Sequence, residues 1–532
     1  MKHVLLLYPV LPRSFWSFQE VLRATGRKSL IPPLGLLTIA SLLPDDWTPR
    51  LVDLNVRPLT EDDWNFADIV MISAMLVQRD GVFACAAEAK KRGKLVVAGG
   101  PYPTSACQEV LDAGCDFVIA GEGEQAIPLL LDAIAQGQPG GVIRAEGTTD
   151  IATAPLPRLD LIRHADYDAM PVQTSRGCPF ACEFCDVINL FGRVPRYKPA
   201  EQVLAELEAI FQTGYRGSIF VTDDNFIGNP EQAERLLRLL APWNRAHGEP
   251  FWFTTQASIN LGQRTDLIDL MTAANFGYVF IGIESPDTNV LAGAQKMQNT
   301  RHPLLDSIRT INHNGLSVIG SFILGFDRET KDAGSRIEAF VEAAAIPLVM
   351  VNALQAVPGT KLWDRLQEEG RIVAGDVGDM ATGVMNFKPD RPLEDILTEQ
   401  LAAWDHLYAP DKFLNRTLNC ILGMRPTRSA QGVTSPEVAP KQASSNGNLA
   451  DTLLQLRLLG KTIWRFGIVS SGRMAFWKAL WTVWRRNPSR IRRFLTLIVM
   501  GYDILCFIDV IHQRARPALN ALQQKKSAAP AV

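Results

Sequence analysis

The chain has 532 residues, of which 47% are hydrophobic, so it is too long for one ordinary domain and can build sizeable cores. Its 54 Lys and Arg nearly balance its 56 Asp and Glu, but residues 451–532 hold 14 basic and only 3 acidic side chains. These counts exclude a single-domain protein with evenly spread charge. A basic end on an acidic body predicts an anionic surface as its partner.

The N-terminal stretch MKHVLLLYPVLP lacks the features of a secretory signal, because its apolar run is short and no small-residue cleavage site follows. We therefore expect a cytoplasmic protein whose cysteines stay reduced. Three of the eight cysteines crowd into one loop, where metal binding or catalysis is more common than a disulfide. The other five are expected to be small buried hydrophobic side chains: Cys85, Cys107, Cys115, Cys420 and Cys506.

Residues 1–150 alternate short β-branched runs with helical stretches. This alternation predicts a doubly wound, flavodoxin-like parallel sheet, which binds ligands at the carboxyl ends of its strands. Glycines at these ends permit a close approach of the backbone to a large ligand, although glycines after strands are usually turns. The expected strands lie within 3–9, 50–55, 68–75, 94–101 and 116–123. The candidate ligand contacts at their ends are Ser73, Gly99, Gly100, Gly121 and Glu122.

A proline-containing linker over residues 151–170 leads to a second alternation over 171–375. Its first strand runs into the cysteine loop. Six strand–helix units predict a partial (β/α)6 barrel with its chemistry at the C-terminal mouth. The five later strands are expected within 218–225, 251–258, 278–285, 316–326 and 348–360.

Beyond residue 375 the alternation stops. We expect a helical extension over 376–426 and a basic helical tail over 449–532. Between them, residues 427–448 are rich in Ser, Pro, Ala and Gly, which predicts a flexible linker.

The tail combines Trp, Arg and long apolar stretches, as in FWKALWTVWRRNPSRIRRF, which is typical of interfacial helices. Its stretch Phe494–Ile511 is about one membrane span long, but Asp503 and Asp509 make spanning costly. We therefore expect the tail to lie on the inner face of the cell membrane rather than to cross it. The alternative is a helical cap packed on the barrel.

The stretch TSRGCPFACEFCDV carries Cys178, Cys182 and Cys185. Thiolates are soft ligands that select zinc, copper(I) or iron–sulfur clusters. Zinc would need a fourth Cys or His, usually from a second Cys-x-x-Cys, and the chain has no such second pair. Three ligands instead suit a [4Fe–4S] cluster with one open iron that can bind substrate.

The pattern Cys178-x-x-x-Cys182-x-aromatic-Cys185, followed by this barrel, resembles the signature of the radical S-adenosylmethionine (SAM) enzymes. The resemblance implies that the open iron chelates the amino and carboxylate groups of SAM. It also implies reductive cleavage of SAM to a 5′-deoxyadenosyl radical, which abstracts hydrogen from an unactivated carbon. An electron donor such as flavodoxin or ferredoxin is then an expected partner.

The same resemblance assigns SAM contacts to the later strands. Family members usually bind the methionine amino group with Gly-Gly-Glu after the second strand. Here Asp223, Asp224 and Asn225 stand in that place, so which carboxylate acts is open. An ammonium group favours a carboxylate, and a ribose favours a bidentate acceptor. The other implied contacts are Glu284 and Ser285 for the ribose, Gly320 and Gly325 for the adenine, and Gln256 and Ser258 at the mouth.

The front domain resembles that of the cobalamin-binding radical SAM enzymes, through PPLGLLTIASLLP (32–44) and VVAGGPYPT (96–104). No His stands in the loop after the first strand. The Asp-x-His-x-x-Gly motif that supplies a lower cobalt ligand in other cobalamin proteins is missing as well. Several members of the group lack this motif and still bind cobalamin. The resemblance therefore implies the cofactor and leaves the cobalt ligand open.

Further segments resemble the subgroup that contains the hopanoid C-2 methylases. The implied reaction is methylation of an unactivated carbon in a polycyclic isoprenoid lipid, with C-2 of a hopanoid as the best assignment. One SAM would supply the radical, methylcobalamin the methyl group, and a second SAM would remethylate the cobalamin. The matching segments are CDVINLFGRVPRYKP (185–199), DDNFIGN (223–229), FIGIESP (280–286), MQNT (297–300), LQAVPGTKLWDRL (354–366) and GVMNFKPD (383–390).

Two other functions stay open at this point. One is a cobalamin-dependent radical SAM cyclase or oxidase, or a methylase of a natural product or tetrapyrrole. The other is a corrinoid-binding sensor or membrane scaffold with a vestigial barrel, which the intact three-cysteine loop argues against. The tail's charges alternate with long apolar runs and form no nucleic-acid-binding module, so we expect no nucleic-acid partner.

Overall fold

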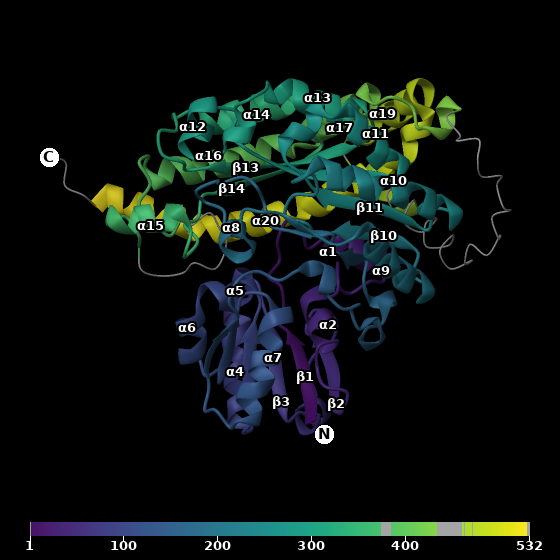
Figure 1. The fold of residues 1–532 in the computed structure, drawn as a ribbon. Helices are drawn as coiled ribbons and strands as arrows, with labels where there is room; N and C mark the ends of the chain where they lie inside the picture. The colour runs from purple at the N-terminus through teal and green to yellow at the C-terminus, as the bar shows by residue number, and fades with distance from the viewer. Residues whose placement is uncertain (1, 374–384, 433–459, 462, 471, 529–532) are drawn as a thin grey trace. The chain divides into compact units, whose positions relative to one another are not determined.

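The computed structural model describes residues 2–373, 385–432, 460–461, 463–470 and 472–528 (Figure 1). The chain forms two compact units, and each is described by itself. The first unit comprises residues 1–13, 27–228 and 355–379, and the second comprises 14–26, 229–354 and 380–532. Of the predicted linker 427–448, residues 433–448 lie outside the described residues, as do 376–384 of the predicted helical extension.

The first unit begins with a six-stranded, wholly parallel sheet in the order β2-β1-β3-β4-β5-β6. The predicted doubly wound sheet is confirmed, and β6 is a sixth strand that the sequence pattern did not indicate. The strands are β1 (Lys2–Tyr8), β2 (Trp47–Asp53), β3 (Ile69–Ser73), β4 (Leu95–Gly99), β5 (Phe117–Ala120) and β6 (Gly141–Arg144).

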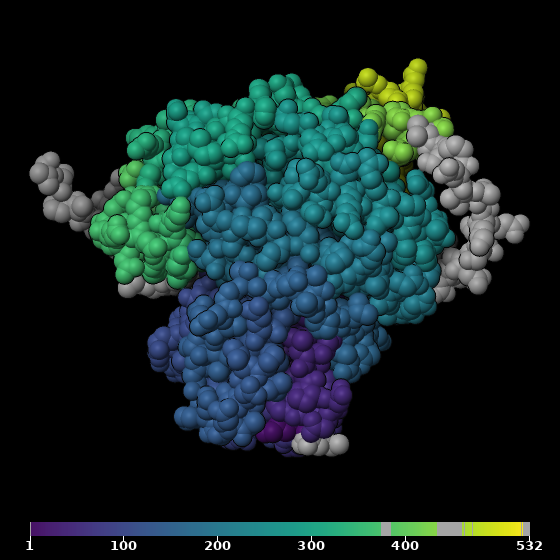
Figure 2. Space-filling model, viewed as in Figure 1, coloured from purple at the N-terminus to yellow at the C-terminus, as the bar shows by residue number. Residues whose placement is uncertain are grey.

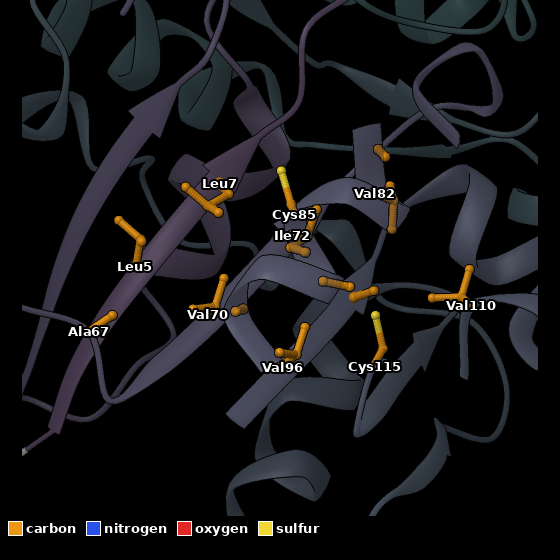
Figure 3. Close-up of a cluster of buried hydrophobic side chains, with 14 of the residues drawn as sticks. Leu5, Leu7, Ala67, Val70, Ile72, Val82, Cys85, Val96, Val110 and Cys115 are labelled. Atoms are coloured by element: carbon orange, nitrogen blue, oxygen red, sulfur yellow. The ribbon is translucent and has the colours of Figure 1, made fainter. Parts of the chain in front are cut away.

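Hydrophobic side chains cover both faces of this sheet, because alternate residues of each strand point to opposite sides. Leu5 and Leu7 belong to one buried cluster, which Figure 3 shows, and Val4 and Leu6 belong to the other. Helices close both faces, which is why the strands read as near-continuous apolar runs. The first cluster includes residues of α3 (Glu61–Phe66), α4 (Arg79–Lys91), α5 (Pro101–Ser105) and α6 (Cys107–Asp112), and the second those of α2 (Leu34–Ala40) and α7 (Gly123–Ala135).

The remainder of the first unit surrounds the cysteine loop. Strands β7 (Ala169–Val172) and β10 (Gly217–Val221) pair in parallel, with α9 (Ala200–Gln212) between them in the chain. A short antiparallel pair, β8 (Ser175–Arg176) and β9 (Arg196–Tyr197), brackets the loop and α8 (Val187–Phe191). Helix α15 (Lys361–Glu368) belongs to the same unit.

The second unit contains four parallel strands in the order β14-β13-β12-β11. These strands are β11 (Phe251–Gln256), β12 (Phe276–Glu284), β13 (Ser317–Leu324) and β14 (Leu348–Ala353), each within or beside a predicted strand. The strands alternate with α10 (Pro230–Ala246), α11 (Thr265–Ala273), α12 (Thr288–Gly293), α13 (Leu304–His313) and α14 (Ala333–Ala344).

In its described residues, the C-terminal part of this unit is mostly helical, as predicted. It consists of α16 (Leu393–Leu407), α17 (Pro410–Gly423), a π-helix over Ile463–Val469, α19 (Arg473–Arg486) and α20 (Ile491–Ala528). Cys420 of α17 is buried, like Cys85 and Cys115 in the first unit, whereas Cys107 and Cys506 are half-buried.

Helix α20 packs on the protein through part of its apolar stretch. The segment Pro488–Leu522 is long and apolar enough to cross a membrane, but half of its most apolar stretch is buried inside the protein. It contacts α16, α17, β14 and α1 (Gln19–Thr25). Up to residue 516 its exposed side chains are all polar: Arg492, Thr496, Asp509, Gln513 and Arg516. For α20 the structure therefore shows the packed cap that the sequence left as the alternative.

Asp503 shows why a charge is tolerated in the apolar stretch of α20. It is 2% exposed, and its Oδ1 accepts the backbone N–H groups of Glu20 at 2.6 Å and Val21 at 3.3 Å. These two groups belong to the first turn of α1, where helical N–H groups lack partners within the helix. The carboxylate therefore caps α1 and fixes α20 against it.

We predict that Asp503→Ala destabilises this unit by about 1–3 kcal/mol, because two buried N–H groups lose their acceptor. Asp503→Asn keeps an acceptor oxygen and should recover most of the loss. Asp509→Ala is the matched control on the exposed side of α20 and should change stability by less than about 0.5 kcal/mol. Calorimetric melting of the three variants checks this, and equal melting temperatures would contradict the capping role.

Candidate active site

The three loop cysteines lie between β8 and α8. Cys182 is buried, Cys178 and Cys185 are half-buried, and none forms a disulfide. The N–H of Cys178 donates to Gly192 O at 3.3 Å, and that of Cys185 donates to Cys182 O at 3.3 Å. Gly177 has a φ of +96°, and a side chain there would lie 2.9 Å from Gly192 O, so the loop needs glycine at this position.

The donor set suits a cluster better than a single ion. Within the described ranges no group of three or more His, Cys, Asp or Glu is placed to hold one metal ion. A zinc site needs its ligands to converge on one point. A [4Fe–4S] cluster is bound through different irons, so its three thiolates need not converge. Three free thiols on one loop fit a cluster that leaves one iron open, and the bound cluster would supply the electron that cleaves SAM.

Asp223 joins the end of β10 to the start of the cysteine loop. Its Oδ1 accepts the backbone N–H groups of Thr174 at 2.7 Å and Ser175 at 3.0 Å. Its Oδ2 accepts the Ser175 hydroxyl at 2.8 Å and the Thr174 hydroxyl. The side chain is fully buried, and burial raises its pKa while the four hydrogen bonds oppose that rise. Both oxygens are thus occupied by the protein.

Asp224 differs from its neighbour in exposure and in partners. It is half-buried, and its Oδ2 accepts the N–H of Gly177 at 2.9 Å. Burial raises the pKa of Asp224 to about 6, and the nearby carboxylates of Asp223 and Asp186 add to the rise. A cation placed beside this carboxylate would relieve both effects. Asp224 is therefore the better suited of the two to receive the amino group of SAM.

A segment that is distant in the sequence also contacts the cysteine loop. The carbonyl of Glu183, between the second and third loop cysteines, accepts the N–H of Leu362 at 2.9 Å. Its carboxylate accepts Arg365 Nη2 at 3.0 Å. The Nδ2 of Asn189 in α8 donates to Gly359 O. The segment around α15 thus braces the cysteine loop, a role that the motif LQAVPGTKLWDRL did not reveal by itself.

A third set of contacts links the loop to the front sheet within the same unit. Arg176, two residues before the first loop cysteine, donates to Glu122 at 2.8 Å and to both oxygens of Glu124, at 2.6 and 3.0 Å. Arg196 also pairs with Glu122, at 2.7 Å. All four side chains are at most 16% exposed. Burial would raise the pKa of Glu124, but Arg176 holds it below its usual value.

The front sheet gathers its candidate contacts at one edge. Ser73 and Gly99 end neighbouring strands, and the Cβ of any side chain at position 100 would lie 2.9 Å from Ser73 Oγ. Thr104 links this turn to the next, because its hydroxyl donates to Gly100 O at 2.8 Å and accepts the N–H of Gly121 at 3.0 Å. At this glycine-lined edge a Cβ added at Gly121 would meet no atom within 4 Å, so the edge leaves room for a ligand. Glu122 follows Gly121 in the chain, and its carboxylate forms ion pairs with Arg176 and Arg196.

Apart from Gly320, the candidate SAM contacts of the second unit lie at or just after the ends of β11, β12 and β13. Glu284 ends β12 in the left-handed region, with a φ of +66°, and its Oε1 accepts Lys296 Nζ at 2.5 Å. Asn299 donates to the carbonyls of Gly282 and Ile283, at 3.1 and 3.0 Å. The MQNT segment and the lysine before it therefore fix the bend at Glu284. Gln256 is the last residue of β11, and Ser258 follows it.

The two candidate glycines of β13 have different surroundings. Gly320 lies in the middle of the strand, where an added Cβ would touch Ile283 and Ile346 at 3.4 Å. Gly325 follows the strand with a φ of +98°, and its N–H donates to Glu329 at 2.8 Å. Only Gly325 stands at the strand end, where a parallel sheet binds its ligands. Ser285 is buried directly after Glu284, and its hydroxyl accepts the N–H of Asp287 at 3.1 Å.

The fold and the cysteine loop define the class. Residues 172–340 match the Radical SAM superfamily, residues 21–131 match the B12 binding domain, and residues 360–516 match a domain of unknown function, DUF4070. The protein is therefore a radical SAM enzyme with a cobalamin-binding domain. Its cofactors are a [4Fe–4S] cluster, SAM and cobalamin.

Full-length relatives narrow the class. An uncharacterized methyltransferase of Synechocystis sp. is 42% identical over 98% of this chain and 96% of its own. The hopanoid C-2 methylase of Rhodopseudomonas palustris is 32% identical over 100% of this chain and 98% of its own. The chain belongs to the family of cobalamin-dependent radical SAM methyltransferases.

Solved structures share the fold. The cobalamin-dependent SAM radical enzyme OxsB, with aqua-cobalamin and SAM bound, has a TM-score of 0.61 at 15% identity. That match covers 100% of this chain and 85% of OxsB. The radical SAM methyltransferase TsrM from Kitasatospora setae has a TM-score of 0.55 at 16% identity, covering 69% of this chain and 76% of its own.

We propose separate roles for the two aspartates and predict separate defects. Asp223→Asn places an amide N–H₂ against hydrogen-bond donors, so the protein should retain less iron after anaerobic reconstitution. Asp224→Asn should keep its iron and bind SAM about 10- to 100-fold more weakly, since a charge-assisted contact is lost. Iron analysis and equilibrium binding of SAM measure the two effects. Full iron with weakened SAM binding in Asp223→Asn would reverse the assignment.

We predict that the Glu124–Arg176 pair supports the cysteine loop. Glu124→Gln leaves a buried arginine with too little countercharge, which should cost about 3 kcal/mol and speed loss of iron. The matched control is Glu109→Gln, which removes the carboxylate that pairs with Arg79 in a more exposed ion pair between α6 and α4. That change should cost less than about 1 kcal/mol. Equal iron-loss rates for the two variants would contradict a supporting role.

Proposed function

We propose that this enzyme uses methylcobalamin to methylate an unactivated carbon of a polycyclic isoprenoid lipid, with C-2 of a hopanoid as the substrate position. The observation that carries the proposal is the end-to-end similarity to a hopanoid C-2 methylase, at 32% identity over the whole chain. The hopanoid C-3 methylase of Methylococcus capsulatus is also related, at 26% identity over 63% of this chain.

In this proposal each candidate residue has one task. Cys178, Cys182 and Cys185 hold the cluster, and Asp224 receives the amino group of SAM. Glu284, fixed by Lys296, orients the ribose. The glycine-lined edge of the front sheet holds cobalamin, which supplies the methyl group when bound. The protein's contribution is to hold the reacting groups in line and to exclude water.

A lipid substrate also gives the basic tail a purpose. We propose that the enzyme works at the inner face of the cell membrane, where such a lipid resides. The charge of residues 451–532 supports this location, because anionic lipid headgroups attract clustered Lys and Arg. A reducing partner protein of the flavodoxin or ferredoxin type would supply electrons to the cluster.

The test is an anaerobic methylation assay. The reconstituted enzyme receives cobalamin, a reductant, SAM with a deuterated methyl group, and membranes that contain unmethylated hopanoids. We expect mass spectrometry of the extracted lipids to find the labelled methyl on the hopanoid A-ring. Cys182→Ala should abolish both the lipid label and 5′-deoxyadenosine, since one cluster ligand is lost.

Other outcomes separate the alternatives. If 5′-deoxyadenosine forms and no lipid carries label, the hopanoid substrate is wrong and the radical chemistry stands. Tetrapyrrole substrates would then be tried next, because a bacteriochlorophyllide d C-12(1)-methyltransferase is 23% identical over 64% of this chain. If an intact cluster yields neither product, a corrinoid-binding sensor becomes the better explanation.

A further inference from the structure

Helix α19 exposes its aromatic side to solvent. The side chains at spacings of three, four and three residues share one face of the helix. Their exposed fractions are 75% for Met474, 42% for Trp477, 55% for Trp481 and 62% for Trp484. The opposite face is buried, through Phe476, Ala479 and Val483. The exposed face is therefore apolar although the helix already has a packed side.

The neighbouring π-helix extends this surface. It exposes Trp464, Ile468 and Val469, by 50% or more of each side chain. The two elements are joined, because the indole N–H of Trp477 donates to Gly467 O at 2.8 Å. We call the exposed side chains of α19 and the π-helix the tryptophan face. A contiguous apolar surface of this kind indicates a docking site.

The contrast with α20 shows that this exposure is local. Both helices come from the same basic, apolar tail. The exposed positions of α20 are polar up to residue 516, and its apolar side lies on the protein. Within the described part of the tail, the exposed Trp side chains belong to α19 and the π-helix. Helix α19 lies in the upper right of Figure 1, and Figure 2 shows the same side of the molecule in space-filling form.

The positive charge around the tryptophan face indicates that its binding partner is anionic. Residues 460–493 contain nine Lys and Arg and no Asp or Glu. Arg473, Lys478, Arg485 and Arg486 are exposed on α19 itself, and the guanidinium of Arg485 lies 5.4 Å from the centre of the Trp481 ring. Trp and Arg together suit the boundary between acyl chains and anionic headgroups.

We infer that the tryptophan face is the membrane-binding surface of this protein and that it docks on anionic phospholipid. The inference deepens the proposed function, on which it rests for its biological purpose. Trp477, Trp481 and Trp484 insert at the headgroup level, and the flanking Arg and Lys side chains contact the phosphates. Helix α19 is 14 residues long and spans about 21 Å, so it lies along the surface rather than across it.

The face is separate from the strand ends that carry the SAM contacts. Directly after α19, Asn487 donates to the carbonyls of Ile421 and Met424 at 3.0 and 2.9 Å. Arg493 then donates to Gly277 O and Ser317 Oγ, at the N-terminal ends of β12 and β13. Apart from Gly320 in the interior of β13, the candidate SAM residues of these strands stand at the opposite ends. Changes on the tryptophan face should therefore leave SAM chemistry intact.

The test uses the full-length protein with its cluster and measures sedimentation with vesicles. We expect binding to vesicles of equal phosphatidylglycerol and phosphatidylcholine, weaker binding to phosphatidylcholine alone, and weaker binding at high salt. The double variant Trp481→Ser/Trp484→Ser should bind about tenfold more weakly or worse. Arg485→Gln/Arg486→Gln should lose a similar factor on the anionic vesicles only.

Controls separate docking from misfolding. Leu129→Ser removes an apolar side chain that is 45% exposed on α7, and it should bind vesicles like the wild type. All variants should release 5′-deoxyadenosine from SAM at the wild-type rate in solution. The inference is overturned if the wild type binds no vesicle, or if the double Trp variant binds as well as the wild type. It is also overturned if the Trp changes dissociate an oligomer, because the face then binds a second copy.

The docking inference and the proposed reaction can fail independently. Vesicle binding that depends on the tryptophan face, without label on any hopanoid, would reject the substrate and leave the membrane surface in place. Labelled hopanoid in detergent, made by a protein that binds no vesicle, would reject the surface and leave the substrate in place.

Discussion

The buried carboxylate of Asp223 is the interaction on which the candidate site depends. It lies two residues after β10 and accepts hydrogen bonds from two backbone N–H groups and two hydroxyls at the start of the cysteine loop. A buried charge is expensive unless its oxygens are fully satisfied, and four donors satisfy this one. Because the carboxylate would be costly to bury without these four donors, the start of the loop is held in one position relative to β10. Asp224, the next residue, accepts one backbone N–H group from the loop and can take another role.

Two further contacts constrain the same loop from other directions. Glu183 accepts hydrogen bonds from the side chain of Arg365 and from the backbone N–H of Leu362. Arg176 forms ion pairs with Glu122 and Glu124 of the front domain. Each joins segments far apart in the sequence, so a disturbance in either region is transmitted to the cysteines. A radical enzyme benefits from such a frame, because its reacting centres must be held within a small tolerance.

The sequence predicts the parts of the site that depend on spacing. The three cysteines at intervals of four and three, the alternation of strands and helices, and the glycines at strand ends are all local patterns, and the sheets in both units follow them. The parts that depend on long-range pairing are not readable in this way. Asp223 and Asp224 are the same residue type in the sequence, and only their hydrogen-bond partners in the structure distinguish them. Gly320 fits a ligand contact as a letter, yet it packs between two isoleucines in the strand interior.

In the tail, too, the sequence does not predict which side chains are buried. Its helices α19 and α20 both combine Arg with apolar residues, and a sequence pattern assigns both to a membrane surface. In α20 the acidic Asp503 is used as a helix cap, so the apolar side faces the protein and the outer side is polar. In α19 the buried face consists of Phe476, Ala479 and Val483, so the tryptophans lie on the opposite, exposed face. Burial, rather than composition, therefore decides which helix has an apolar surface to offer a membrane.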